Sequence, residues 1–374
     1  MLYMKLLDKG LNKFFFSYNF LGECMKKILL LFILLIPIKV DAISASSYVV
    51  IDMDSNNVLY SYNSDEKRLI ASISKIMTCI VAIENTDINK EVVVGDEIFA
   101  AVGSNIYIEK GEKLTISDLL YGLMLRSGND AALSIAKNVS GSIDDFVVLM
   151  NQYAKKIGMT NTIFSNPSGL ENKEGLGNIS TSYDMALLTS YAMKNSTYKK
   201  IVSTKNKTVK SNLKSYSWIN KNKLLSHDFI TGGKTGFTKK ARRTLVSTAS
   251  KDNMNIVIVT LNDPDDFDDH LDLYQKVFND YQSYFILNKK NFEVANVYYP
   301  SDTLYIKNNY KLTLKKGANI IEDVKLLKIH NYDNNDVVGY VSVKVDDKEV
   351  HRESVYVKKI IKKKWYQKLL NYFK

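Results

Sequence analysis

The chain has 374 residues, of which 45% are hydrophobic and 24% are charged, so it is a globular protein with room for two domains and not a fibre or a disordered chain. Its formal net charge of +11 is concentrated at the two ends: residues 1–42 carry +3 and residues 356–374 carry +7, which leaves +1 for the part between them. This near-neutral body lacks the broad basic face that nucleic-acid binding requires.

Residues 1–42 are predicted to be a leader with a signal peptide at residues 25–42. Two lysines at positions 26 and 27 precede an apolar run from Ile28 to Ile38, and small residues follow at Ala42 and Ala45. The run is shorter than the about 20 residues that span a bilayer. We therefore expect export with cleavage of the leader, and an uncleaved anchor is the alternative. Met1 and Met25 both fit as the start of the chain.

Residues 47–63, SYVVIDMDSNNVLYSYN, predict a hairpin of two short strands around the turn DSNN. Most of residues 71–200 has apolar residues three and four positions apart, which predicts helices. The first helix contains Cys79. Because Cys24 is lost with the leader, Cys79 is the one cysteine of the exported chain, and we expect a buried, unreactive thiol and no internal disulfide.

A serine and a lysine open that first helix, in ASISKIMTCIVAIEN at residues 71–85. Ser72 and Lys75 lie three positions apart and share one helix face. The spacing alone is weak evidence, because it recurs at Ser64, Ser134, Ser196 and Ser211. What distinguishes Ser72 is its place at a helix start, where backbone N–H groups and the helix dipole can stabilise negative charge on a nearby oxygen.

A serine hydroxyl becomes nucleophilic only when a base takes its proton. The chain has four histidines, at positions 227, 270, 330 and 351, and no G-x-S-x-G motif, so a serine–histidine–acid triad is disfavoured. A lysine can replace histidine if burial or a second cation lowers its pKa from about 10.4 toward neutrality. Lys75 is therefore the candidate base for Ser72.

Two further motifs could complete such a site. Ser127 and Asn129 occupy the break between two helical runs in GLMLRSGNDAALSIA. Lys234, Thr235 and Gly236 form the one K-[ST]-G of the chain, at the start of a predicted strand. Lys234 and Thr235 could hold a carboxylate, and Gly236 would let another backbone approach closely. A lysine-rich turn is the plain alternative.

The rest of the first domain should close its sheet. Residues 244–262 predict a hairpin of core strands, and residues 270–287 predict a closing helix. The acids of NDPDDFDDH, residues 262–270, suit a helix N-terminus better than a calcium loop, whose spacing Phe267 interrupts. We expect no metal and no cofactor. Strands on both sides of a helical block predict one mixed α/β (α+β) domain at residues 43–287, with an antiparallel sheet completed by distant parts of the chain.

A small all-β domain is predicted at residues 291–355, from the alternating runs EVANVYYP, SDTLYIK, YKLTLK and VVGYVSVKV. Residues 356–374 predict a basic amphipathic helix with seven lysines on one face and aromatic and aliphatic residues on the other. Such a helix suits the surface of an anionic membrane, although a solvated terminal helix packed on its own domain is the alternative.

The three motifs, in this order, resemble those of the low-molecular-mass penicillin-binding proteins that act as serine D-alanyl-D-alanine carboxypeptidases, the family of penicillin-binding protein 5. The flanking segments SGNDAA, MNQYAKKIGMTNTIFSNPSGL and STSYDMALL are also similar. The resemblance covers nearly the whole exported chain. It implies a serine β-lactamase/transpeptidase-like domain with a helical subdomain, an exported location on the outer face of the cytoplasmic membrane, peptidoglycan stem peptides as substrates and β-lactams as covalent inhibitors.

The resemblance also implies roles for individual residues. Ser72 would attack the carbonyl between two D-alanines, and Lys75 would accept its proton. Ser127 with Lys234 would pass a proton to the leaving amine, and Asn129 would orient Lys75 and the substrate. Lys234 and Thr235, on the same strand as Gly236, would recognise the terminal carboxylate of the substrate. The N–H groups of Ser72 and Phe237 would form the oxyanion hole.

Two alternatives remain. A class A β-lactamase would need a deacylating glutamate in an E-x-x-L-N setting and usually an aspartate inside S-x-N, but Glu174 begins EGLGN and Gly128 replaces the aspartate. A non-catalytic module that binds cell-wall peptides or β-lactams is disfavoured because every polar residue of the motifs is present. The chain also departs from the family in having Arg242 and Arg243 after Ala241; they would grip an anionic peptide or lie at a solvated strand edge.

Overall fold

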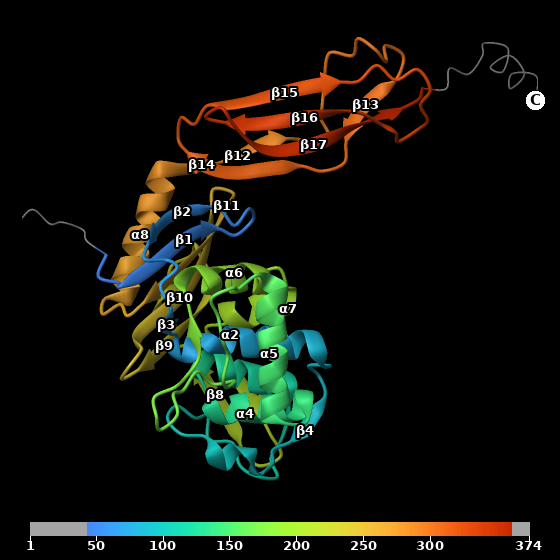
Figure 1. Cartoon of the computed structure of the whole chain (residues 1–374). Helices are drawn as coiled ribbons and strands as arrows, with labels where there is room; N and C mark the ends of the chain where they lie inside the picture. The colour runs from blue at the N-terminus through green and yellow to red at the C-terminus, as the bar shows by residue number, and fades with distance from the viewer. Residues whose placement is uncertain (1–42, 361–374) are drawn as a thin grey trace, which may run out of the picture. The chain divides into compact units, whose positions relative to one another are not determined.

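The computed structural model describes residues 43–360, so the predicted leader and most of the predicted tail helix lie outside the described residues. A five-stranded antiparallel sheet organises the first part of the chain, in the order β2-β1-β11-β10-β9 (Figure 1). Its strands are β1 (Ser47–Asp52), β2 (Val58–Tyr62), β9 (Ile230–Thr238), β10 (Arg242–Lys251) and β11 (Met254–Leu261). Both predicted hairpins are confirmed, and distant segments complete one sheet as expected.

Helices cover both faces of this sheet (Figure 1). Neighbouring residues of a strand point to opposite faces. Accordingly, Ser247 of β10 hydrogen-bonds to His270 and Tyr274 of α8 (Asp266–Asp280), whereas Thr248 contacts Met193 at the end of α6 (Ser182–Ala192). Burial on both faces explains why β10 and β11 consist of nearly continuous apolar and small residues.

The predicted helical block is confirmed. It contains η1 (Ala71–Ser74), α2 (Lys75–Asn85), η2 (Asp96–Ala100), α3 (Ile116–Tyr121), the π-helical turn η3 (Gly122–Arg126), α4 (Asn129–Ser140), α5 (Ile143–Ile157), α6, α7 (Ser196–Ser203) and η4 (Lys223–Ser226). Three two-stranded ribbons connect these elements: β3 (Arg68–Leu69) with β6 (Ile179–Ser180), β4 (Glu91–Val93) with β5 (Lys113–Thr115), and β7 (Asn206–Lys210) with β8 (Ser215–Ile219).

Helix α2 is the central helix of the block, because every residue from Lys75 to Ala82 is buried. The surrounding helices start at ordinary N-caps: Thr115, Ser142 and Thr181 each accept a hydrogen bond from the backbone of the first turn. Cys79 lies inside this core, as predicted, and burial raises the pKa of its thiol.

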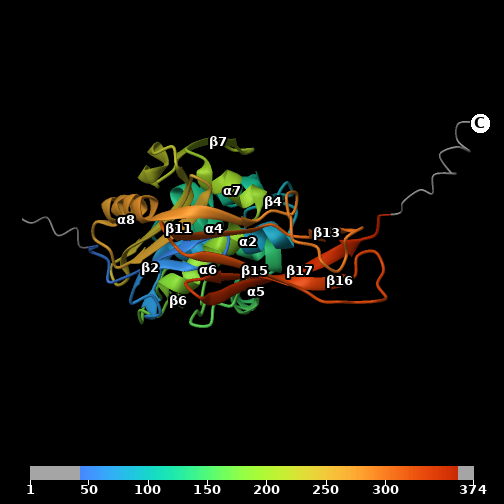
Figure 2. The same ribbon diagram turned by 90° about the horizontal axis from the view of Figure 1, so that it is seen from above.

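The last described part of the chain is all β, as predicted. Strands β13 (Thr303–Ile306), β17 (Lys348–Lys358), β16 (Val337–Val345) and β15 (Ile320–Leu326) lie side by side in one antiparallel sheet (Figures 1 and 2). Its own small core is built mainly from valines of β16 and β17. A separate ribbon pairs β12 (Tyr281–Leu287) with β14 (Tyr310–Lys315).

Three details of the prediction were wrong. The closing helix predicted at 270–287 ends at Asp280, because the aromatic and β-branched run that follows forms β12 instead. The segment EVANVYYP at 293–300 contains no strand. The tail helix predicted from residue 356 cannot begin there, since β17 continues to Lys358. Because β12 pairs with β14, we propose a domain boundary near residue 280 in place of 287.

Three acids of residues 262–270, Asp266, Asp268 and Asp269, lie in the first turn of α8, and Asp265 is its N-cap, so these acids are at a helix N-terminus as the sequence indicated. In the segment 43–360 the side chains of His, Cys, Asp and Glu form no group of three that could hold a metal ion. Over the same residues, no helix has both the length and the hydrophobicity that crossing a membrane demands.

Candidate active site

Ser72 lies in the tight turn η1, directly before α2. Ala71 adopts a φ of +48°, which a non-glycine residue takes only where its surroundings hold it. Here the carbonyl of Ile70 accepts a hydrogen bond from Thr244 Oγ1 at 3.1 Å, and the carbonyl of Ala71 accepts one from Ser74 Oγ at 2.8 Å. The turn is thus fixed to strand β10, and the serine hydroxyl has a defined position.

Ser72 faces a cavity of about 470 Å³. Residues from all three sequence motifs or their neighbours line it, together with residues of β10 and α8: Ser72, Ser104, Ser127, Lys221, Lys223, Thr235, Gly236, Phe237, Arg243, Asp266 and Phe267. The predicted candidates that are far apart in sequence therefore meet at one cavity. Lys75, Asn129 and Lys234 are buried beside it.

Lys75 is fully buried and its Nζ has three polar neighbours. They are Ser72 Oγ at 3.1 Å, Asn129 Oδ1 at 2.7 Å and the carbonyl of Ser168 at 2.5 Å. Burial lowers the pKa of Lys75 well below its ordinary value, and the cations Lys234 and Lys221 lower it further, against a smaller opposing effect of Asp130.

This set of neighbours suits a neutral amine. A neutral amine has two N–H bonds and one lone pair. Its two N–H groups can donate to Asn129 Oδ1 and to the Ser168 carbonyl, which accept only, so its lone pair is left for the hydroxyl proton of Ser72. The arrangement can therefore remove the proton of Ser72.

Asn129 is oriented by its other bonds. Its Nδ2 donates to the carbonyl of Val102 at 2.6 Å, so its Oδ1 must face Lys75. The next residue, Asp130, accepts hydrogen bonds from the backbone N–H groups of Ile106, Tyr107 and Ile108. Asp130 thereby holds the loop that forms this wall of the cavity. Sequence reasoning missed it, although it directly follows the S-x-N motif.

Ser127 separates η3 from α4, as the sequence predicted, and it adopts a left-handed conformation with a φ of +65°. A non-glycine residue in this region is a strained position of the kind that clusters at functional sites. Within residues 43–360 its hydroxyl has no hydrogen-bond partner from the protein and it lines the cavity. It is available to a molecule bound there.

Lys234 is only 1% exposed, and its Nζ donates to the carbonyl of Thr235 at 2.7 Å. Burial, with a contribution from the nearby cation Lys221, lowers its pKa to about 7. No direct hydrogen bond joins Lys234 to Ser127 in the described part of the chain. A proton relay between them stays a proposal and needs a bound substrate or a small movement.

Strand β9 carries the K-T-G motif past Ser72. The sequence predicted the motif at the start of a strand. In the structure it lies in the second half of β9, a separate strand at the edge of the sheet. A Cβ on Gly236 would lie 3.0 Å from the N of Ser72 and 2.4 Å from Thr244 Oγ1. Only glycine permits this approach, as predicted. Phe237 follows at the cavity and is 60% exposed.

A loop at residues 165–170, the end of the family-like segment MNQYAKKIGMTNTIFSNPSGL, completes the site from behind, although its role was not predicted. It supplies the Ser168 carbonyl to Lys75. Asn166 Oδ1 accepts from the backbone of Ser168 and Gly169. Buried Asn178 closes the loop by accepting from the N–H groups of Ser165 and Asn166 and donating to the Asn166 carbonyl.

Two more cavity residues are Lys221, which the sequence did not indicate, and Arg243, whose role the sequence left open. Lys221 is exposed at the cavity, and partial burial of its ammonium, with a smaller effect of the cation Arg126, lowers its pKa. Arg243 pairs with Asp266 at 2.5 Å, and its side chain is 43% exposed. The sequence left Arg243 between a peptide contact and a solvated strand edge, and its position at the cavity favours the contact. By contrast, His270 of α8 does not line this cavity. It is buried against β10 and β11, where it hydrogen-bonds to Ser247 and Thr260.

The antiparallel sheet between helical layers, with a serine–lysine pair at the start of the central helix, defines a protein of the serine β-lactamase/transpeptidase-like class. A profile of the Peptidase_S11 family, described as D-alanyl-D-alanine carboxypeptidase, matches residues 37–265. The chain belongs to this family, and the resemblance drawn from the motifs is confirmed.

Individual relatives agree with this assignment. D-alanyl-D-alanine carboxypeptidase DacF of Bacillus subtilis is 36% identical over 222 residues, which are 58% of this chain and 56% of that protein. DacA of Escherichia coli is 28% identical over 367 residues, 90% of this chain and 88% of that protein. The crystal structure of penicillin binding protein 5 from Haemophilus influenzae superposes with a TM-score of 0.70 at 26% identity, over 85% of this chain and 97% of that one. The match thus spans little more than half of the Bacillus relative and nearly all of the penicillin binding protein 5 chain.

Proposed function

We propose that the chain is a serine D-Ala-D-Ala carboxypeptidase that removes the terminal D-alanine from peptidoglycan stem pentapeptides. The observation that carries the proposal is the environment of Lys75: a buried amine with a lowered pKa, two fixed acceptors and Ser72 Oγ at 3.1 Å. Family membership supports the same activity.

In the proposed reaction, Ser72 Oγ attacks the carbonyl carbon of the penultimate D-alanine while its proton passes to Lys75. The N–H groups of Ser72 and Phe237 stabilise the oxyanion. The C–N bond then breaks, and the departing amine of D-alanine takes a proton through Ser127, with Lys234 behind it. Water attacks the resulting ester and restores the Ser72 hydroxyl.

Substrate recognition follows from the charge of the cavity. The ammonium form of Lys234, with Thr235 beside it, attracts the terminal carboxylate of the substrate. Lys221 adds positive charge to the cavity. We propose that β-lactams enter in the same way and acylate Ser72. In residues 43–360 no carboxylate hydrogen-bonds to Ser72 or Lys75. The glutamate with which a class A β-lactamase deacylates therefore has no counterpart at these atoms. We expect the acyl-enzyme formed with a β-lactam to persist.

The test is incubation of the purified protein with a pentapeptide ending in D-Ala-D-Ala and, separately, with a chromogenic cephalosporin, beside a Ser72→Ala variant. We expect release of D-alanine by the parent chain alone and slow turnover of the cephalosporin. Rapid cephalosporin turnover would identify a β-lactamase. Labelling by penicillin without release of D-alanine would identify a binding module.

We further propose that the protein is exported and lies on the outer face of the cytoplasmic membrane, held by the basic segment 356–374. The support is the signal-peptide pattern at residues 25–42 and the +7 charge of the tail. Cosedimentation with vesicles containing phosphatidylglycerol should require the part of this segment that follows β17, residues 359–374, and should weaken with salt. Equal binding by a chain that ends at residue 358, which keeps all of β17, would overturn this proposal.

A further inference from the structure

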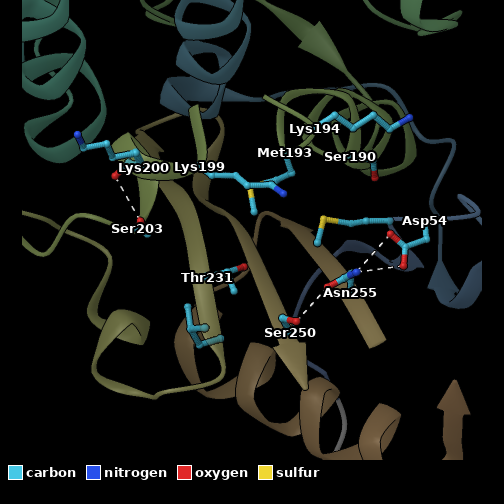
Figure 3. A pocket seen from close by; sticks show the side chains of 12 residues that line it. Asp54, Ser190, Met193, Lys194, Lys199, Lys200, Ser203, Thr231, Ser250 and Asn255 are labelled. Carbon is cyan, nitrogen blue, oxygen red and sulfur yellow. Dashed lines mark hydrogen bonds between the residues drawn. The ribbon is translucent and has the colours of Figure 1, made fainter. Parts of the chain in front are cut away.

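A second cavity, of about 660 Å³, lies at the opposite end of β9 from Gly236 (Figure 3). Strand β9 begins there with Ile230 and Thr231. Helices α6 and α7, the β1–β2 connection and the adjoining ends of β10 and β11 complete the walls. None of its lining residues also lines the cavity at Ser72. A volume of this size is within the range of sites for small organic molecules.

The inner surface of this cavity is largely apolar and contains one unpaired hydroxyl. Met53, Met193 and Ile230 are each less than a tenth exposed and form the apolar part. Methionine side chains adapt readily to the shape of an apolar ligand. Ser190 of α6 is 3% exposed, and within residues 43–360 its Oγ has no hydrogen-bond partner.

That hydroxyl is unusual. Buried polar atoms are nearly always hydrogen-bonded, and a serine in a helix can bond to the carbonyl one turn earlier. Figure 3 shows the Ser190 oxygen directed toward the interior of the cavity. Its unsatisfied bonding capacity is therefore available to a molecule bound there.

The rim of the cavity is positively charged. Lys194, Lys199 and Lys200 line it, with Asp54 as the one carboxylate. In the described residues none of the three lysines forms an ion pair. Asp54 lies on the far side, where it accepts from Asn255 Nδ2 at 3.0 Å. In Figure 3 the ammonium of Lys199 reaches over the cavity, and that of Lys200 points away from it.

We propose that this cavity binds a small amphiphilic anion, an organic molecule with an apolar body and a carboxylate, phosphate or sulfonate group. The methionines and Ile230 hold the apolar body, Lys199 pairs with the anionic group, and Ser190 donates to an acceptor of the ligand. The site is separate from the Ser72 cavity and does not depend on the proposed carboxypeptidase activity.

The test is a fluorescence titration of the full chain with 8-anilinonaphthalene-1-sulfonate, an amphiphilic organic anion. We expect saturable binding at one site, weakened by added salt. Lys199→Gln should weaken the affinity about tenfold or more, the effect of losing one charge-assisted contact. Lys200→Gln, in the same helix with its ammonium directed away, is the matched control and should bind like the parent. Both positions are exposed, so neither variant should unfold the protein.

Two further variants make the result decisive. Ser190→Ala should weaken binding without lowering the melting temperature of the free protein, because the hydroxyl it removes has no partner there. Lys221→Gln changes the Ser72 cavity and should leave binding unchanged. Absence of saturable binding, equal loss in Lys199→Gln and Lys200→Gln, or a loss confined to Lys221→Gln would each overturn the proposal.

Discussion

The Nζ of Lys75 lies 3.1 Å from the Oγ of Ser72, and burial with two neighbouring cations lowers the pKa of this lysine. The low pKa and the short distance have the same origin, since the first residue of α2 points into the core, where its amine hydrogen-bonds to the Ser72 hydroxyl, one amide and one carbonyl.

Replacing Lys75 by arginine should abolish activity. Arginine keeps the positive charge but does not lose its proton in proteins, so it cannot act as the base. We expect kcat for D-alanine release to fall about 10²- to 10⁴-fold, with a similar fall in the rate of acylation by benzylpenicillin. Lys67→Arg, at an exposed position, is the control and should behave like the parent. A Lys75→Arg enzyme that retains most of its activity would rule out proton transfer to Lys75.

Lys234 should give the pH profile a descending limb. Its pKa of about 7 means that the ammonium form is present below this pH and lost above it. Since the charged form attracts the terminal carboxylate, kcat/KM should decline as the pH rises through about 7, and Lys75 should impose an ascending limb on the acid side because the base must be neutral. The limbs report the coupled set of lysines and not single residues.

The assignment of the descending limb can be checked by substitution. In Lys234→Arg the charge persists at all pH values used, so the decline above about pH 7 should disappear even if the absolute rate falls. A pentapeptide with a terminal amide has no carboxylate to attract and should also lack it. An unchanged limb in both experiments would show that another group causes the decline.

Gly236→Ala should damage the site more than the fold. The added Cβ would lie 3.0 Å from Ser72 N and 3.1 Å from Ile73 N, both of them backbone atoms that cannot move independently of η1. We expect a shift of β9 away from Ser72 and a loss of acylation rate of at least about tenfold, since small displacements of reacting groups are costly. At Gly95 the nearest atoms belong to the flexible side chain of Glu97, so Gly95→Ala is the control. Equal rates in the two variants would contradict the close approach.

The sequence located the parts of the site that depend on side-chain identity. Ser72 and Lys75 are one turn apart, and a single helix start places both, so their proximity could be predicted from spacing alone. The close approach of another backbone to Gly236 could be predicted because a Cβ at that position would prevent it. The two hairpins and their meeting in one sheet were foreseen because their central strands are strongly apolar, whereas the separate edge strand β9 was not.

Other contributions could not be read from the sequence. The Ser168 carbonyl is a backbone group, and any residue at that position would supply one. Asp130 and Asn178 act by binding backbone N–H groups of distant loops, and nothing local to them shows which loops these are. Similarly, Tyr281–Leu287 continues an apolar helical pattern, and its pairing with β14, distant in sequence, makes it a strand.

Asn178 offers a test of the loop that supports Lys75. Its side chain is 1% exposed and makes three hydrogen bonds to the backbone of Ser165 and Asn166. Asn178→Ala leaves these groups unpaired in a buried place, at a cost of about 1–3 kcal/mol for each group that finds no water. The melting temperature should therefore drop.

If the loop also positions the Ser168 carbonyl on Lys75, kcat should fall while KM changes little. The acid limb of the pH profile should also move, because Lys75 loses an acceptor. Asn138→Ala removes a bond within one helix, to the Ser134 carbonyl, and should alter neither kcat nor the pH profile. A less stable Asn178→Ala protein with the parent's kcat and acid limb would show that the loop stabilises the fold without tuning the base.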